Sequence, residues 1–470
     1  MSKEKIQKNY GFVVAETEAL AREKAIEKFP ELADKKFKLR QDEDVFDTWF
    51  SSWLWPLSVF DGINNPDNED INYYYPTNDL VTAPEIIFFW VARMIMAGYE
   101  YNGKECFKNV YFTGIVRDKL GRKMSKSLGN SPDPLELINK YGADGVRMGM
   151  LLTSPAGNDL PFDENLCEQG RNFNNKIWNS FRLVKGWEVA DIAQPNYANI
   201  AVKWFESTLA KTVEEVDDLF SKYRLSEALM TIYKLFWDEF SAWYLELIKP
   251  AFGQPIDKKT FDITLHFFDS LLKLLHPFMP FITEELWQSI AERKQGESIM
   301  FASLNNNQTI DSDLLQNFEI SKEIIANIRN LRQQKNISPK EKLSLHVAGK
   351  HNTEFDDVIE KMANITPIYP NLSTDGKLPY FEGKGWAFLV GVTEYTIPLD
   401  NLINAEEEIK KIESDIKYYE SFLATVLKKL SNEKFVANAK PEVVEMERKK
   451  QSDTQTKLQT LHDSLKKLKG

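Results

Sequence analysis

Cysteine and long apolar runs are scarce in this chain. Its 470 residues include only two cysteines, Cys106 and Cys167, in no paired spacing, so neither a disulfide framework nor a structural zinc site is expected. The longest apolar stretch, residues 86–99, is interrupted by Arg93 and is too short to span a bilayer, so it predicts a core helix and no membrane partner. No secretory signal is visible, and the reducing cytoplasm is the expected location.

Positive charge is also in the minority. The formal net charge of -11 argues against a general nucleic-acid binder, so an RNA partner would have to be held by local basic patches. Hydrophobic residues make up 43% of the chain and aromatic residues 12%, which is ample for large cores. At about 100–200 residues per domain, the length predicts roughly three domains.

The most informative stretch is a glycine-flanked basic loop, GRKMSKSLGN, at 121–130. An apolar, β-branched run at 109–116 predicts a buried strand before it, and an Asp-Pro-Leu-Glu start predicts a helix over 133–142 after it. Open α/β sheets hold nucleotides where a strand, a loop and a helix follow one another in this way. Lys123 and Lys126 would then face phosphates, whereas the alternative is a lysine-rich surface turn.

The pentapeptide KMSKS at 123–127 is a signature of class I aminoacyl-tRNA synthetases. Its surroundings, VRDKLGRKMSKSLGNSPDPLELI, resemble the branch that charges valine, isoleucine and leucine. Within that branch, DVFDTWFSSWLWP at 44–56, the run at 86–114 and SNEKFVANAKPEVVEMERKK at 431–450 are similar to valyl-tRNA synthetases. The resemblance covers nearly the whole chain from about residue 10, and an isoleucine-specific enzyme is a more distant alternative.

Part of the family pattern cannot be found here. Its His-Ile-Gly-His signature belongs to the first half of the nucleotide-binding fold, and none of the five histidines stands in such a setting. Residues 1–41 resemble the return segment from the inserted editing domain, which is itself absent. The resemblance therefore implies the C-terminal portion of a synthetase, which we do not expect to be active alone. The alternative is a tRNA-binding module that performs no chemistry.

The remaining chain is expected to form four parts, a multidomain α/β plus all-α fold. Residues 42–160 resemble the C-terminal half of a Rossmann-like catalytic domain, and the amphipathic segments of 161–337 resemble a helical anticodon-binding domain. Strand candidates LSLHVA and WAFLVG suggest a small α/β appendage at 338–400. Apolar residues spaced alternately by three and four predict an antiparallel coiled-coil arm at 401–470. Three polar residues weaken its seam: Glu447, Gln451 and Thr454.

The resemblance assigns residues to the catalytic site. Trp49, Ile86 and Trp90 would line an apolar slot for the isopropyl group of valine, with Glu85 as a candidate contact for the substrate ammonium. Ordinary core packing is the alternative for these aromatic residues. Lys123 and Lys126 would be catalytic, with Mg²⁺ accompanying ATP and no metal-ligating residue assigned. The expected ATP-binding residues are Gly114, Asp118, Lys123, Met124, Ser125, Lys126 and Ser127.

Basic and amide side chains outside this site are candidate tRNA contacts, because a local excess of base suits RNA phosphates. A solvated helix face is the alternative at each position. The candidates are Arg171, Asn175, Lys176, Lys428, Lys429, Lys434, Arg448, Lys449 and Lys450. The implied partners are tRNA-Val, valine and ATP. The implied reaction is ATP-dependent activation of valine to valyl-adenylate and its transfer to tRNA by a monomeric valine–tRNA ligase.

Overall fold

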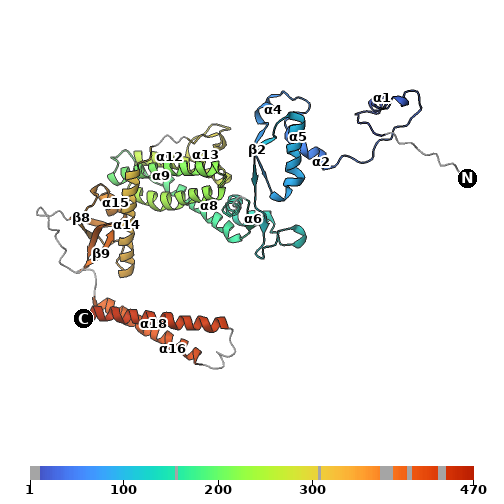
Figure 1. Ribbon diagram of the computed structural model, residues 1–470. Coiled ribbons are helices and arrows are strands. Elements are labelled where there is room, and N and C mark those ends of the chain that lie inside the picture. Colours follow the sequence, from blue (N-terminus) through green and yellow to red (C-terminus); the bar gives the residue numbers. More distant parts are fainter. Residues whose placement is uncertain are drawn as a thin grey trace. The chain divides into compact units, whose positions relative to one another are not determined.

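The computed structural model describes residues 11–153, 157–304, 309–370, 385–399, 405–431 and 441–469 (Figure 1). The chain divides into two compact units. Unit 1 comprises Met1–Ile115 with Pro155–Asp159, and unit 2 comprises Val116–Ser154 with Leu160–Gly470. Among the described residues, no helix is both long enough and apolar enough to cross a membrane.

Unit 1 is organised around two parallel strands, β1 (Thr77–Thr82) and β2 (Phe107–Phe112), connected through the helix α5 (Ala92–Asn102). Parallel strands need such a crossover because their ends point the same way. Gly103 ends α5 at φ 65°, a left-handed conformation that glycine adopts at little cost. The other helical elements are α1 (Glu18–Lys28), η1 (Pro30–Leu32), α2 (Thr48–Trp53), α3 (Trp55–Ser58), α4 (Glu69–Tyr74), η2 (Pro84–Ile86) and η3 (Ile87–Val91).

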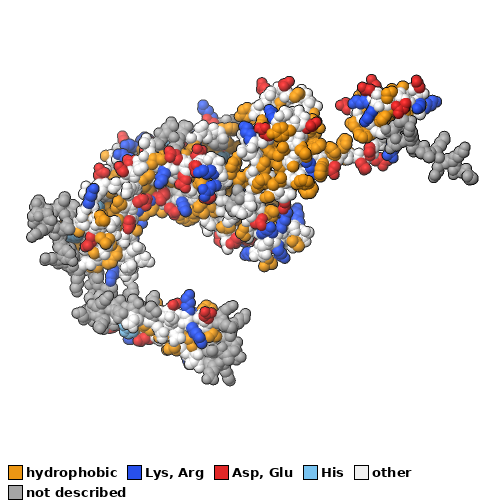
Figure 2. All heavy atoms as spheres, in the orientation of Figure 1, with side chains coloured by type: hydrophobic (Ala, Val, Ile, Leu, Met, Phe, Trp, Pro, Cys, Tyr) orange, Lys and Arg blue, Asp and Glu red, His pale blue; other side chains and the backbone are white. Residues whose placement is uncertain are grey.

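The apolar stretch that predicted a core helix is helical, but only one of its faces is buried. Its first part forms a π-helical turn, η3, which leads directly into α5. Val91 and Met94 pack in the core of unit 1, whereas Phe88 is 74% and Phe89 is 51% exposed. The predicted core helix is therefore present, with one face in the core and the opposite face exposed. This face contributes to a large apolar surface, visible over the α5 region in Figure 2.

The strand predicted over 109–116 is two strands. β2 ends at Phe112, and the backbone N–H of Thr113 still donates to the carbonyl of Thr82 at 2.8 Å. The chain then leaves the sheet at Gly114, a residue type that weakens strands. It forms β3 (Val116–Arg117), which belongs to unit 2 and pairs in parallel with β4 (Leu160–Pro161).

The helix predicted after the basic loop is present as α6 (Pro134–Tyr141). Its N-cap is Asp133, whose side chain accepts a hydrogen bond from the N–H of Leu135 at 2.8 Å, and Gly142 ends it at φ 77°. The proline at the first helical position has no N–H to leave unpaired. The predicted start and end signals were therefore correct.

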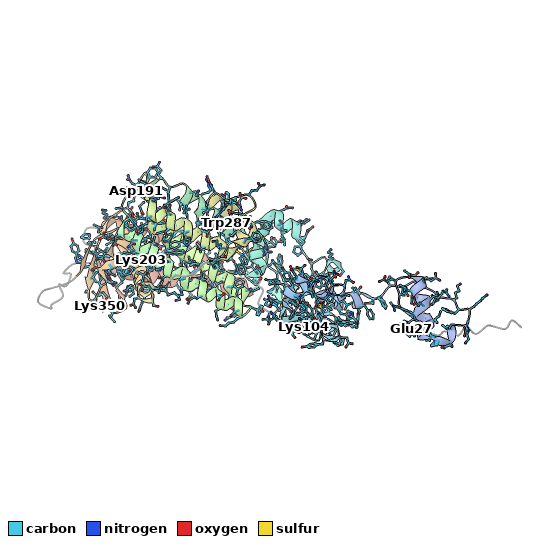
Figure 3. All side chains as sticks on the ribbon, turned by 90° about the horizontal axis from the view of Figure 1, so that it is seen from above. Glu27, Lys104, Asp191, Lys203, Trp287 and Lys350 are labelled. Carbon is cyan, nitrogen blue, oxygen red and sulfur yellow. The ribbon has the colours of Figure 1, made fainter. Side chains whose placement is uncertain are left out.

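Unit 2 continues as a helix bundle, as the amphipathic segments predicted. Its buried centre contains the ring of Phe205, whose centroid lies 5.2 Å from that of Phe240 and 5.0 Å from those of Tyr244 and Phe267. Trp287 (Figure 3) connects two neighbouring helices, because its indole N–H donates to Asp269 at 2.8 Å. The helices are α7 (Ala143–Leu151), α8 (Glu164–Lys185), α9 (Asn196–Ser221), α10 (Leu225–Lys234), η5 (Leu235–Tyr244), α11 (Leu245–Ile248), α12 (Lys258–Leu275), α13 (Pro280–Ile290), η6 (Ile299–Phe301) and α14 (Ser312–Lys335). A short parallel pair, β5 (Val189–Ala190) and β6 (Ile256–Asp257), lies between them.

Two contacts attach the segment after the basic loop to this bundle. A Cβ on Gly170 of α8 would lie 2.9 Å from the Cα of Gly145 on α7, so the two helices approach at a distance that only glycine permits. The buried carboxylate of Asp144 also accepts hydrogen bonds from the N–H groups of Phe281 and Ile282, at 3.3 and 2.7 Å. It thereby caps the N-terminus of α13, where unpaired N–H groups favour an acid.

A four-stranded sheet follows the bundle and shares its core. The strand order is β8-β7-β10-β9, and the predicted strands LSLHVA and WAFLVG correspond to β7 and β9. Leu345 and Ile397 of the sheet belong to the same buried cluster as Phe318 of α14. The elements are β7 (Leu343–Ala348), η7 (Thr353–Phe355), α15 (Asp356–Ala363), β8 (Ile365–Pro370), β9 (Gly385–Val390) and β10 (Thr393–Pro398).

The C-terminal part consists of two long helices that pack against one another, α16 (Ala405–Leu430) and α18 (Pro441–Lys469), shown in red in Figure 1. Ile416, Val426 and Leu458 are buried between them, at positions that the spacing predicted. The structure describes the backbone but not the side chains of the other predicted seam residues 409, 412, 461, 465 and 468.

Candidate functional site

The basic loop begins as a tight hairpin in unit 2. The N–H of Met124 donates to the carbonyl of Val116 at 3.1 Å, and the N–H of Asp118 donates to the carbonyl of Arg122 at 2.9 Å. Gly121 closes the turn at φ 75°, a conformation that favours glycine. The returning segment therefore brings Lys123 and Met124, the first two residues of KMSKS, directly beside β3, whereas the sequence predicted only an unspecified loop.

The carboxylate of Asp118 is the centre of this hairpin. Its Oδ1 accepts hydrogen bonds from the N–H groups of Leu120 and Arg122, at 3.0 and 2.9 Å. Its Oδ2 accepts from Arg122 Nε at 2.8 Å and from Asn130 Nδ2 at 2.9 Å. The hydrogen bond from Asn130 and that from Arg122 hold the pKa of Asp118 well below its usual range. Asp118 thus has partners within the loop for both of its oxygens.

Asn130 closes the loop from the other end. Besides its bond to Asp118, its Oδ1 accepts a hydrogen bond from the N–H of Ser125 at 2.9 Å, and its Nδ2 reaches the carbonyl of Lys123 at 3.3 Å. Sequence reasoning selected neither Asn130 nor Arg122. The signal that could have found them is an acid just before a glycine-bounded loop, with an arginine near the start of that loop and an asparagine at its end.

The candidate catalytic lysines lie on the outer side of this framework. Lys123 and Lys126 are both exposed. Ser125 caps a short 3₁₀ turn, η4 (Lys126–Leu128), by accepting from the N–H of Leu128 at 3.3 Å, and its hydroxyl lies 3.2 Å from that of Ser127. Residues 116–126 hold five Lys or Arg side chains and one acid, Asp118. This concentration of cations is suited to a polyanionic ligand, and Figure 2 shows Lys and Arg side chains gathered beside α6.

The residues predicted for the amino-acid pocket lie in unit 1 together with Gly114. Trp49 of α2 is 46% exposed, and Trp90 of η3 is partly buried. The guanidinium carbon of Arg93 lies 2.9 Å from the ring centroid of Trp49 and 5.3 Å from that of Trp90, so both indoles meet at one cation. Ile86 is partly buried and Glu85 is exposed, both on η2. Arg93 itself was not predicted as a site residue.

The candidate tRNA contacts on α8 differ in the contacts that their side chains make within the protein. Arg171 forms an ion pair with Glu168 at 3.0 Å, and Lys176 lies 5.4 Å from the ring centroid of Trp237. Asn175 is exposed.

Two of the candidate lysines in the C-terminal helices share one acid. Glu447 is buried, and its carboxylate lies 2.8 Å from Lys450 on the same helix and 3.7 Å from Lys429 on the other. Lys450 and then Lys429 lower the pKa of this carboxylate. The other described candidates, Lys428, Arg448 and Lys449, are exposed, and Lys434 lies outside the described residues.

Comparison with known proteins links these features. Residues 2–163 match the family model of class I tRNA synthetases (I, L, M and V), residues 202–347 match the anticodon-binding domain of tRNA ligases, and residues 404–469 match the valyl-tRNA synthetase tRNA-binding arm. A valine–tRNA ligase from Phocaeicola vulgatus is 65% identical over 460 residues, which are 98% of this chain and 52% of that protein. The chain belongs to the valine–tRNA ligase family.

A second family member, the valine–tRNA ligase of Parabacteroides distasonis, is 63% identical over 456 residues, 97% of this chain and 51% of its own length. The chain therefore spans about half the length of the curated valine–tRNA ligases it matches. The order of the matched segments, with the tRNA-binding arm last, is consistent with the predicted C-terminal portion. The predicted class of fold is confirmed as a class I synthetase-like part with a mostly helical remainder that includes an anticodon-binding domain.

Among solved structures, a LeuRS–tRNA–LeuAMS ternary complex from Agrobacterium radiobacter K84 is similar over 60% of this chain and 35% of its own. The sequence identity is 20% and the TM-score is 0.44. That likeness is too distant to bear on the function of this member of the valine–tRNA ligase family.

Proposed function

We propose that this chain is the C-terminal portion of a valine–tRNA ligase and provides the KMSKS side of its ATP site together with its tRNA-binding parts. The observation that carries this proposal is the loop at 121–130, which is held as a hairpin with Lys123 and Lys126 on its exposed side. The whole enzyme would join valine to ATP, release pyrophosphate and pass the valyl group to the terminal ribose of tRNA-Val. The portion would not charge tRNA alone.

The chemistry requires no side-chain nucleophile from this chain. The valine carboxylate attacks the α-phosphorus of ATP, and negative charge moves onto the departing pyrophosphate. Lys123 and Lys126 would follow and stabilise that charge, because ammonium groups on flexible stems can track moving phosphates. Mg²⁺ would arrive with ATP and neutralise part of the same charge. Catalysis is then mainly a matter of positioning and electrostatics.

The remaining ATP contacts are proposed on the same loop. Met124, Ser125 and Ser127 would lie along the nucleotide, and Gly114 would allow the backbone to approach it. Asp118 was predicted as an ATP-binding residue. Its oxygens are engaged within the loop, which favours a different role, developed in the next subsection.

The amino-acid slot is proposed around Trp49, Trp90 and Ile86. Two indoles and one β-branched side chain provide an apolar site that matches an isopropyl group. The contacts between Arg93 and both indoles support this proposed slot. A guanidinium that contacts two aromatic rings fixes the orientation of both rings. Glu85, which is exposed, is the proposed contact for the substrate ammonium.

The tRNA would be bound by the helical parts. We propose an anticodon-binding domain at 161–337, a small α/β appendage at 338–400 and a coiled-coil arm at 401–470, following the Rossmann-like half at 42–160 and the return segment at 1–41. Arg171, Asn175 and Lys176 would contact tRNA from the bundle. On the arm the contacts would be Lys428, Lys429, Lys434, Arg448, Lys449 and Lys450. The enzyme would act as a cytoplasmic monomer.

The test is charging of tRNA-Val with labelled valine, first by the chain alone and then with the uncovered half of the Phocaeicola vulgatus relative added in trans. Charging only after the addition is the expected result. The Lys126→Ala variant should lower the rate of valine activation by roughly 10²–10³-fold, as loss of a transition-state contact does. Lys140→Ala, which removes an exposed lysine from α6, is the matched control and should leave the rate unchanged.

Two outcomes would contradict the proposal. Charging of isoleucine in preference to valine would favour the isoleucine-specific alternative. Binding of tRNA without charging under either condition would favour the non-catalytic tRNA-binding module.

A further inference from the structure

The KMSKS loop is anchored by two side chains that lie outside the pentapeptide. Asp118 precedes it and Asn130 follows it, and the amide of Asn130 donates to the carboxylate of Asp118 at 2.9 Å. This single contact joins the two ends of the loop. We define these two residues as the clasp.

The clasp fixes the backbone of the signature itself. The N–H of Ser125 donates to Asn130 Oδ1 at 2.9 Å, and the carbonyl of Lys123 accepts from Asn130 Nδ2 at 3.3 Å. These two backbone groups flank Met124, between the two catalytic lysine candidates. The orientation of Lys123 and Lys126 therefore depends on a side chain that no phosphate needs to touch.

Asp118, the other residue of the clasp, uses its hydrogen-bonding capacity within the loop. Both oxygens of Asp118 accept hydrogen bonds, from the N–H groups of Leu120 and Arg122 and from the side chains of Arg122 and Asn130. The Asp118 side chain is only 11% exposed. A carboxylate with this set of donors has little capacity left for a nucleotide.

We propose that Asp118 and Asn130 are positioning residues, which hold the KMSKS backbone so that Lys123 and Lys126 face the phosphates of ATP. This inference rests on the proposed function. It assigns a new role to Asp118 and adds Asn130, and it places Arg122 as the counter-ion of the clasp, 2.7 Å from Asp118.

The donor and acceptor pattern allows a reciprocal test. Asn130→Asp places a second carboxylate against Asp118 and removes the donor to the Lys123 carbonyl. Asp118→Asn places two amide donors against each other and removes the partner charge of Arg122. The double variant Asp118→Asn/Asn130→Asp restores one donor facing one acceptor and leaves the Ser125 contact in place. If the single variants acted only through a local change of charge, the second substitution would not restore the behaviour of the wild type.

The first measurement is hydrogen exchange, by mass spectrometry, of loop peptides from the full chain without any ligand. We expect the amides of Leu120, Arg122 and Ser125 to exchange roughly 10- to 100-fold faster in each single variant, in line with the loss of a charge-assisted hydrogen bond. The double variant should recover much of the protection. Asn139→Asp, the same change at an exposed position on α6, is the matched control.

The second measurement is valine-dependent exchange of pyrophosphate into ATP, with the complementary half present. The single variants should lower kcat by about tenfold or more and leave the KM for valine unchanged, and the double variant should recover part of that loss. Equal loop exchange in Asn130→Asp and Asn139→Asp would overturn the clasp, as would the absence of any rescue in the double variant. If the wild-type pair has no exchange activity, the proposed function fails, while hydrogen exchange still decides whether the clasp holds the loop.

Discussion

The role of Arg93 can be inferred only from the residues that surround it in the structure. In the sequence it is a charge that interrupts an apolar run, which excludes a membrane span. In the structure the residue is 2% exposed, its guanidinium stacks on Trp49, and its three side-chain nitrogens have no hydrogen-bond partner among the described residues. Stacking on an indole offsets part of the cost of burying this cation, but an acceptor would offset more. The sequence thus shows Arg93 only as a charge in an apolar run, whereas the structure shows it as a buried cation stacked on an indole of unit 1.

Cys106 provides a prediction at the same scale. It is 1% exposed and lies immediately before β2, and burial raises the pKa of its thiol from 9.0 to about 11. A raised pKa means that folding favours the protonated thiol, so this contribution to stability is complete below pH 9.0 and is lost as the pH rises through 11. We expect iodoacetamide at pH 8 to leave Cys106 unmodified in the native chain and to modify it in urea, as mass spectrometry would measure. Rapid native modification would contradict the burial.

The helix pairs of unit 2 show how small residues decide the packing of whole elements. Gly145 and Gly170 are unremarkable in sequence, because a glycine within a helix usually only weakens it. Their backbones meet where α7 crosses α8, which attaches the segment that follows the basic loop to the bundle. The helices themselves follow from periodicity, whereas this crossing follows from the absence of two side chains.

Gly170→Ala tests that crossing. The added Cβ would collide with the backbone of Gly145, which cannot move aside as a flexible side chain could. We expect the substitution to lower the stability of unit 2 by about 1–3 kcal/mol, the usual range for overpacking, with a matching fall in the melting temperature. Asn179→Ala, at an exposed position on the same helix, should change the melting temperature little. An unchanged melting temperature for Gly170→Ala would show that the helices separate easily.

The two C-terminal helices provide a second prediction at the scale of elements. Glu447 forms ion pairs with Lys450 and Lys429, two of the candidate RNA contacts. Because these lysines lower its pKa below 4.5, the pairing stabilises the helices above that pH and is lost as the pH falls. Glu447→Gln frees both ammonium groups and should raise tRNA affinity severalfold, with a steeper dependence on salt. Filter binding across salt concentrations measures both quantities.

Glu445→Gln is the control for that measurement. It removes the same charge from an exposed position two residues away on the same helix. Equal effects of the two variants would indicate a general charge effect. No effect of either variant would argue against RNA contact by this part of the helices.

At the scale of the whole molecule, unit 1 exposes many large apolar side chains. Phe46, Phe88, Phe89 and Tyr99 are all at least half exposed, and they belong to a larger set of exposed apolar side chains in this unit. Its sheet has two parallel strands, whereas parallel sheets are normally covered on both faces. Surfaces of this kind mark interaction sites.

We therefore expect the isolated chain to bind the dye ANS at this surface, and the complementary half of the Phocaeicola vulgatus relative to suppress the dye fluorescence on addition. Phe88→Ser/Phe89→Ser should weaken that suppression by removing apolar contact area. Tyr418→Ser, an exposed aromatic on α16, is the control outside unit 1. Dye binding that persists in full after the addition would show that the surface is not covered by that half.

The sequence by itself determined the family, the helix after the signature loop and the succession of helical segments. These features depend on contiguous residues: a five-residue signature, the cap at Asp133 and Gly142, and apolar spacings along one helix. Only the tertiary structure decided that the strand predicted over 109–116 is divided at Gly114, and that one face of the helix after residue 86 remains open.

Only the tertiary structure, likewise, brought Asp118 to Asn130, Arg93 to Trp49 and Glu447 to Lys429. The physical reason is that each of these contacts depends on the register of a hairpin, the crossing of two helices or the pairing of two others. The local sequence is compatible with several such arrangements, and packing selects among them.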